Sequence, residues 1–132
     1  NESVRYQQSR EDKRNYAAHV RLNVSEYAYQ LTKVKELHSE WIDEGIKGVS
    51  YKRPEIEKNM SAALLELEKY KVSLLISVLD DEKGLAFKKS INDIQSYLSE
   101  IIIKKYASIN DSRNWVGRYS DFISDANKYL NN

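Results

Sequence analysis

Large apolar residues recur at alternating intervals of three and four from position 16 to position 41, which is the spacing of one face of an α-helix. This face consists of Tyr16, Val20, Val24, Tyr27, Leu31, Val34, His38 and Trp41. Glycine is favoured just past a helix end, and Gly45 and Gly48 follow the pattern. We therefore predict a helix that ends near Glu44, with His38 as the one member of its buried face that is not plainly apolar.

A second apolar face begins after Pro54, which fits the first turn of a helix because an N–H has no partner there. Glu55 and Glu57 also suit this turn, at the positive end of the helix dipole. The face consists of Ile56, Met60, Ala63, Leu64, Leu67, Tyr70, Leu74 and Val78. It widens towards its end to include Val72, Leu75, Ile76 and Leu79. Because apolar residues there surround the helix, we predict that the second helix is the most buried element.

Two further apolar faces complete the pattern. The third consists of Phe87, Ile91, Ile94, Leu98, Ile101, Ile102 and Tyr106. The fourth consists of Trp115, Tyr119, Phe122, Ile123, Ala126, Tyr129 and Leu130. Asp80 or Asp81 is expected to cap the third helix, unless Gly84 ends the second helix and the third follows directly. The competing N-caps of the fourth helix are Asn110, Asp111 and Ser112.

Amphipathic helices joined by short connections pack antiparallel, so the chain is predicted to be all-α, an antiparallel four-helix bundle with an N-terminally extended first helix. Residues 16–132 form the predicted bundle. Residues 1–15 have only Val4 and Tyr6 as large apolar side chains, and we predict that they form a polar helical stalk or linker. Such a stalk would join the bundle to a membrane anchor upstream of Asn1. A frayed terminus or an expression fragment is the alternative interpretation.

Composition and charge narrow the classes of protein that fit this fold. At 132 residues the chain has the length of one domain with its own core. Lys and Arg number 21 and Asp and Glu number 20, a balance that argues against a nucleic-acid partner. The absence of cysteine excludes disulfides, thiolate chemistry and cysteine-ligated zinc. No apolar run approaches the roughly 20 residues that a membrane-spanning helix needs.

Neither histidine occurs in a pattern that predicts catalysis or metal binding. Di-iron bundles carry Glu-x-x-His on two helices, whereas Lys35 stands three residues before His38 and Tyr16 stands three before His19. The chain also has no glycine-rich phosphate loop and no nucleophile elbow, and its neighbouring carboxylates point in different directions on a helix. We therefore predict no enzyme activity, no catalytic or metal-binding residues and no cofactor, with His38 as a structural histidine.

Aromatic, apolar and basic residues around the first connection predict a partner patch. Tyr29, Tyr51 and Tyr97 lie off the apolar faces and are expected to be exposed. Positions 45–54 hold three basic residues and no acid, which suits an acidic partner or lipid headgroups. The candidate patch consists of Tyr29, Trp41, Ile46, Tyr51, Lys52 and Arg53. A plain solvated loop is the alternative interpretation.

These features favour a non-enzymatic interaction or sensor module, with a protein partner or a second copy of the chain as its target. The soluble domain of a membrane-anchored bacterial protein is one source that fits the stalk. The alternative function is a small-ligand-binding helical bundle, in which the core around His38 and Trp41 encloses a pocket. A deep polar pocket would favour ligand binding, whereas a packed core with an exposed apolar patch would favour the interaction module.

Overall fold

The structure, a computed structural model, describes residues 2–48 and 50–131. Within these residues the chain forms four α-helices and one turn of 3-10 helix. The helices are α1 (Glu2–Ile46), α2 (Arg53–Ser77), α3 (Glu82–Ile102) and α4 (Ile109–Leu130), and the 3-10 turn η1 (Ser50–Lys52) precedes α2. This part of the chain contains no strand, so the predicted all-α class is confirmed.

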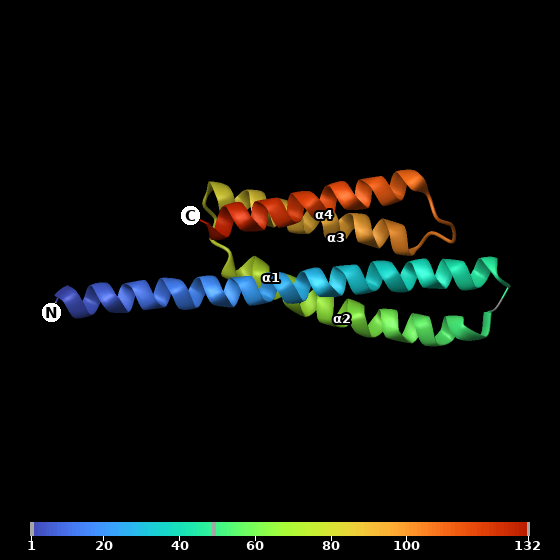
Figure 1. The fold of residues 1–132 in the computed structure, drawn as a ribbon, viewed down its shortest axis with the longest axis horizontal. Coiled ribbons are helices and arrows are strands. Elements are labelled where there is room, and N and C mark those ends of the chain that lie inside the picture. Colours follow the sequence, from blue (N-terminus) through green and yellow to red (C-terminus); the bar gives the residue numbers. More distant parts are fainter. Residues whose placement is uncertain (1, 49, 132) are drawn as a thin grey trace.

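The four helices alternate in direction and pair as two antiparallel hairpins (Figure 1). α1 packs extensively against α2, and α3 packs extensively against α4. The α3–α4 hairpin lies along the C-terminal part of α1, and α1 contacts both of its helices. The predicted helical bundle with a long first helix is therefore confirmed, and α1 is the helix that joins the two hairpins.

An aromatic cluster connects the two hairpins in the core. The ring of Tyr27 on α1 meets that of Phe122 on α4 edge-on, with 5.5 Å between their centroids. Phe87 on α3 lies 5.8 Å from Phe122 and 5.9 Å from Tyr129. The Tyr27 hydroxyl donates a hydrogen bond to Gln95 Oε1 at 2.6 Å, so its polar atom is satisfied although the side chain is buried. Each such ring contact stabilises the fold by about 0.5–1.5 kcal/mol beyond its buried area.

Glycine and aspartate set the ends of two helices. α1 ends at Ile46, two residues beyond the predicted position, and Gly48 follows with φ 73°. Only glycine adopts this left-handed backbone readily, so Gly48 is the residue that turns the chain, whereas Gly45 lies inside the helix. At the start of α3 the N-cap is Asp81, one of the two residues predicted for this position. Its Oδ1 accepts the N–H of Gly84 at 2.7 Å.

α4 begins after Ser108, and none of the three predicted N-caps holds that position. Ser108 has extended backbone, and its Oγ accepts the N–H of Asp111 at 3.4 Å. A serine followed three residues later by an acid resembles the capping box, a signal for a helix start. Because α3 ends at Ile102, Tyr106 lies in the connection and is exposed, and its predicted place on the buried face of α3 is wrong.

The prediction that α2 is the most buried helix is also wrong. Its buried residues are Ile56, Ala63, Leu67 and Leu74. Val72, Ile76 and Leu79, which were expected to widen the buried surface, are exposed. Among the described residues, α2 contacts α1 extensively but has little contact with α3 or α4, so its far side faces solvent. An apolar periodicity shows that a face is apolar, but it does not show whether another helix covers that face.

The N-terminal part of α1 projects beyond the other three helices (Figure 1). Every residue from Glu2 to Tyr16 is exposed, and Asn1 lies outside the described residues. Contact with the bundle begins at Tyr16, whose hydroxyl donates to the backbone oxygen of Ser77 and lies 2.6 Å from the Tyr129 hydroxyl. α1 is continuous across this point. None of the described helices is both long and apolar enough to cross a membrane.

Candidate functional site at the loop end

The α1–α2 connection and the α3–α4 connection lie at the same end of the bundle, opposite the N-terminus (Figure 1). We call this end the loop end. His38 on α1 ties the second connection to the first hairpin, because its Nε2–H donates to the backbone oxygen of Lys104 at 2.8 Å. His38 is buried, and burial lowers its pKa, whereas the bond to the Lys104 oxygen acts in the opposite direction. His38 thus holds the α3–α4 connection against α1.

Trp41 and Arg53 form a clasp between the end of α1 and the start of α2. The Arg53 guanidinium carbon lies 3.7 Å from the centroid of the Trp41 ring, and Arg53 Nε donates to the Trp41 backbone oxygen at 3.0 Å. Trp41 Nε1 donates to Glu57 Oε1, also at 3.0 Å. Gly45 leaves the space for this arrangement, since a Cβ there would stand 1.8 Å from one guanidinium nitrogen. We refer to this pair as the Trp41–Arg53 clasp.

The six residues of the predicted partner patch therefore fall into three groups. Trp41 and Arg53 contact each other in the clasp. Ile46, Tyr51 and Lys52 are exposed at the tip of the α1–α2 connection. Tyr29 is also exposed, but it stands twelve residues before Trp41, roughly 18 Å along α1, next to Lys33. The structure brings five of the six residues to the loop end and leaves Tyr29 on the shaft of α1.

The α3–α4 connection and the first residue of α4 add residues to this end that lie outside the predicted patch. Ile103, Tyr106 and Ile109, together with Ile46 and Tyr51, are between 63% and 78% exposed. We define the loop-end surface as Ile46, Lys47, Tyr51, Lys52, Ile103, Lys105, Tyr106 and Ile109. The capping signal at Ser108 would have placed Tyr106 in a connection, but only the folded bundle shows that the two connections lie at one end.

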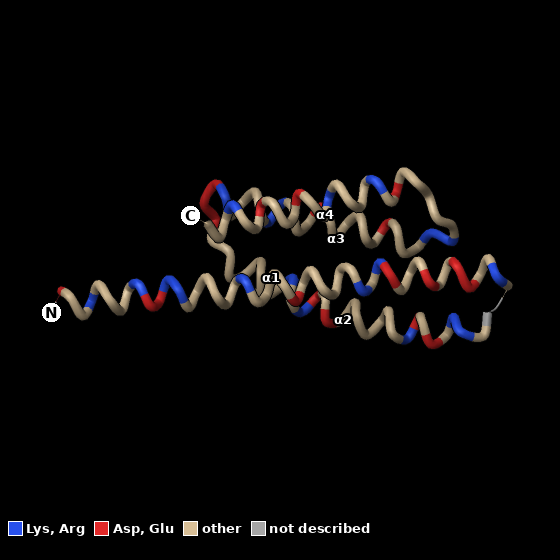
Figure 2. The backbone as a smooth tube through the Cα atoms, in the orientation of Figure 1, with Lys and Arg blue, Asp and Glu red and all other residues tan. Residues whose placement is uncertain are grey.

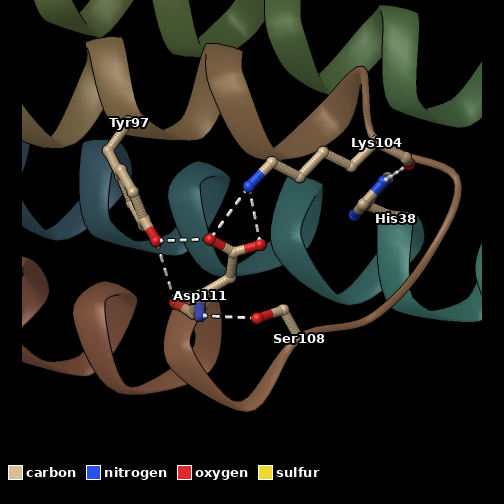
Figure 3. Close-up of polar contacts among 5 residues, drawn as sticks. All are labelled: His38, Tyr97, Lys104, Ser108 and Asp111. Atoms are coloured by element: carbon tan, nitrogen blue, oxygen red, sulfur yellow. Dashed lines mark hydrogen bonds and ion pairs between the residues drawn. The ribbon is translucent and has the colours of Figure 1, made fainter.

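A hydrogen-bonded network fixes the base of the α3–α4 connection (Figure 3). Asp111, near the start of α4, accepts from Lys104 Nζ at 2.8 and 3.0 Å and from the Tyr97 hydroxyl at 2.9 Å. The pKa of Asp111 is lowered, mainly by the bond from Lys104 and then by the bond from Tyr97. The bond to Asp111 in turn raises the pKa of Lys104. Tyr97 is only 7% exposed, so its predicted exposure is wrong. The network joins α3 to α4 across the connection and orders the chain between them.

Charge is unevenly distributed along the bundle (Figure 2). Positions 45–54 and 103–110, the two segments of the loop end, contain five basic residues and no acid. Positions 78–84, at the opposite end, contain three acids and one lysine. Arg53 and Lys104 are used within the fold, whereas Lys52 and Lys105 are exposed and have no ion pair among the described residues. The two connections themselves therefore present positive charge, whereas Asp43, Glu44, Glu55 and Asp111 lie in the helix ends next to them.

The core beside His38 offers little room for a small ligand. The cavity beside His38 has a volume of about 60 Å³ and is lined in part by Ile42 and Tyr106. A drug-sized ligand usually needs a pocket of roughly 300 Å³ or more. Among the residues that the structure describes, no three His, Asp or Glu side chains gather so that they could hold a metal ion.

Comparison of the chain with protein-family models, with curated proteins and with solved structures gives no match. A function must therefore be inferred from the chemistry of the loop end and the other surfaces of this chain.

Proposed function

We propose that this chain is a non-enzymatic interaction module that binds an acidic surface of a protein partner through the loop-end surface. The observation that supports this most is the concentration of exposed apolar, aromatic and basic side chains on two connections at one end of the bundle. Exposed apolar residues that occur singly are normal, but several that gather on adjoining segments are typical of contact surfaces. Tyrosine is enriched in such contacts because its ring packs while its hydroxyl remains hydrogen-bonded.

The chemistry of the surface defines the kind of partner. Tyr51 and Tyr106 supply rings that can be buried in a partner, and Lys52 and Lys105 supply cations at the rim. An open groove of about 500 Å³ beside Ile109, lined also by Val116, can accept an apolar side chain of the partner. Unopposed cations steer an acidic surface towards this end and make association dependent on ionic strength.

The fold supports this role by holding both connections in place. The Trp41–Arg53 clasp fixes the first connection, and the bond from His38 with the Asp111 network fixes the second. Binding through pre-ordered segments loses less conformational entropy than binding through mobile loops. α1 is about 68 Å long at 1.5 Å per residue, so its N-terminal end lies far from the loop-end surface. In this proposal residues 1–15 are a spacer.

Site-specific photo-crosslinking in the native host tests the proposal. A photoreactive phenylalanine analogue replaces Tyr51, Tyr106 or, as the matched control, Tyr29, which is similarly exposed but lies outside the loop-end surface. We expect one protein to crosslink at Tyr51 and Tyr106 but not at Tyr29, and to present an acidic face. Equal crosslinking at Tyr29, or no protein adduct at Tyr51 and Tyr106, would contradict the proposal. Binding of the purified chain to vesicles with 25% phosphatidylglycerol, lost on substitution of Tyr51 by serine, would instead assign the surface to lipid.

A further inference from the structure

His38 is a buried titratable residue whose hydrogen bond holds the α3–α4 connection against α1. Its side chain is 2% exposed, and its Nε2–H donates to the backbone oxygen of Lys104 (Figure 3). Lys104 lies in the connection, two residues past the end of α3 at Ile102. Tyr106 and Ala107 of the same connection line the small cavity beside the imidazole. His38 thus holds the segment that carries half of the loop-end surface.

The groups around this cavity do not compensate a positive charge on the imidazole. The titratable and charged residues that line the cavity are Lys35 from α1, Lys104 and Tyr106 from the connection, and Asp111 from α4. α3 contributes the apolar Ile101. The Asp111 carboxylate already accepts bonds from Lys104 and Tyr97. The acid nearest to the imidazole on this side is therefore occupied by other donors.

The side towards α2 supplies no acid to the imidazole either. The Trp41 ring stands 6.3 Å from the imidazole and nearly parallel to it. Arg53, the first residue of α2, lies over the Trp41 ring, and Glu57 accepts the bond from Trp41 Nε1. Within the part of the chain that the structure describes, no carboxylate forms an ion pair with His38. A proton on His38 would thus add a buried charge without a partner of opposite sign.

We propose that protonation of His38 releases the α3–α4 connection from α1, so that the loop end loses order in acid. Burial lowers the pKa of His38, the bond to the Lys104 oxygen opposes this effect, and the charge of Lys35 adds to it. A histidine whose pKa is lowered by its surroundings favours, once protonated, any arrangement in which it is exposed. The attached arrangement is therefore fully favoured above about pH 6.5, the ordinary pKa of histidine, and is weakened as the pH falls below that value.

Release of the connection is a smaller movement than unfolding of the bundle. Openings that break few buried contacts cost the least free energy, and Lys105 and Tyr106 on this segment are already exposed. The ion pair between Asp111 and Lys104 persists in mild acid because the pKa of Asp111 is lowered, so the segment stays joined to α4 while it leaves α1. At about pH 5 the opening equilibrium rises by at most about 30-fold, and we expect about tenfold.

Thiol labelling measures this opening, because the chain contains no cysteine of its own. Ile42→Cys places a thiol in the wall of the His38 cavity, and Ala63→Cys places a control thiol in the buried face of α2. The rate of reaction with dithiodipyridine is divided by the rate of the same chain unfolded in urea at the same pH, which removes the titration of the thiol. From about pH 7 to about pH 5 this relative rate should rise about tenfold for Ile42→Cys and less than twofold for Ala63→Cys.

Substitution of the histidines assigns the effect to one residue. His38→Gln combined with Ile42→Cys should abolish the rise, because glutamine can donate to the Lys104 oxygen but does not titrate. His19→Gln, at an exposed position of α1, should leave the rise unchanged. A relative rate that does not rise in acid, that still rises with His38→Gln, or that rises equally for Ala63→Cys would overturn the proposal. An NMR titration in which His38 of the unaltered chain gains its proton at the same pH as in urea would overturn it too.

The consequence for binding rests on the proposed function, whereas the release itself does not. Crosslinking from Tyr106 to the acidic partner should decline from about pH 7 to about pH 5 in the unaltered chain and persist with His38→Gln. Acid release without a protein adduct at Tyr51 or Tyr106 would confirm the role of His38 and contradict the proposed function. Crosslinking from Tyr106 that is equal at both pH values would contradict the regulatory consequence while the proposed function stands.

Discussion

Gly45 lies in the last turn of α1, and its lack of a side chain leaves room for the guanidinium of Arg53. Replacement of Gly45 by alanine changes two contributions to the free energy of unfolding in opposite directions. Alanine stabilises a helical position by about 0.5–1 kcal/mol relative to glycine. The new Cβ, however, would stand 1.8 Å from Nη2 and 2.5 Å from Cζ of Arg53, so the guanidinium must move away from Trp41.

The cost of that movement follows from the contacts that Arg53 makes. The hydrogen bond to the Trp41 oxygen contributes about 0.5–1.5 kcal/mol. The contact with the Trp41 ring contributes about 0.5–1 kcal/mol for a partly exposed pair. Loss of both exceeds the gain in helix propensity, so Gly45→Ala should lower the free energy of unfolding by about 0.5–1 kcal/mol. In a chain that already carries Arg53→Ala, only the gain in helix propensity remains. Gly45→Ala should then raise the free energy of unfolding by about 0.5–1 kcal/mol.

Urea denaturation followed by circular dichroism measures this double-mutant cycle. The four chains of the cycle are the unaltered protein, the two single variants and the double variant, and the expected coupling is about 1–2 kcal/mol. Reversal of the sign between backgrounds is the specific result, because a simple change in helix propensity cannot produce it. If Gly45→Ala stabilises both backgrounds equally, the clasp does not depend on the space at Gly45 and the reasoning is refuted.

Four further predictions concern the N-terminal extension, the core, the stability at acidic pH and a buried hydrogen bond. Deletion of residues 1–15 should change the free energy of unfolding by less than about 1 kcal/mol in urea titrations, because the described residues there are exposed. Leu74→Ala should cost about 2–5 kcal/mol, because Leu74 is fully buried. The pKa of Asp111 is lowered in the folded state, so Asp111 stabilises the fold above its ordinary pKa and this contribution is lost as the pH falls. Asp111→Asn should therefore make the melting temperature less dependent on pH below about 4. Tyr27→Phe should cost about 1 kcal/mol in urea titrations, because the bond to Gln95 is lost.

Three of these predictions have a specific outcome that would contradict them. A deletion of residues 1–15 that costs as much as Leu74→Ala would show that the extension packs against a surface, such as a second copy of the chain. A melting temperature of Asp111→Asn that falls with pH as steeply as that of the unaltered chain would remove Asp111 from the account of acid stability. A Tyr27→Phe variant with unchanged stability would show that Gln95 makes no useful bond to the hydroxyl.

The sequence predicted well which face of each helix is apolar, but it predicted poorly which helix packs against that face. The apolar faces through Tyr27, Phe87 and Phe122 form the core, as their periodicity predicts. The same periodicity placed Ile76 in the core, but no other helix of the described chain covers that side of α2, and only tertiary structure reveals this. The pattern predicts that Gly45 follows the end of the first helix, whereas Gly45 lies inside α1 and leaves space for the Arg53 side chain.

The candidate site could be predicted only where it depends on one segment. Ile46, Tyr51 and Lys52 were recognised because they are consecutive or nearly so and lie between two helices. Tyr106 was missed because the apolar spacing of α3 continues past Ile102, and the end of the helix depends on a weak capping signal. That the two connections lie at one end follows from the packing of two hairpins, which no local pattern records.

The central claim, that the loop-end surface binds an acidic partner, is tested most directly by charge reversal against the protein identified by crosslinking. Isothermal titration calorimetry measures the affinity of this protein for the Lys52→Glu/Lys105→Glu variant of the chain. The control, Lys33→Glu/Lys89→Glu, has the same change in net charge at exposed positions on α1 and α3. We predict that the loop-end variant loses at least tenfold in affinity and most of its dependence on salt, while the control changes less than threefold. Equal losses in both variants would contradict the claim, because net charge rather than the loop end would then govern binding.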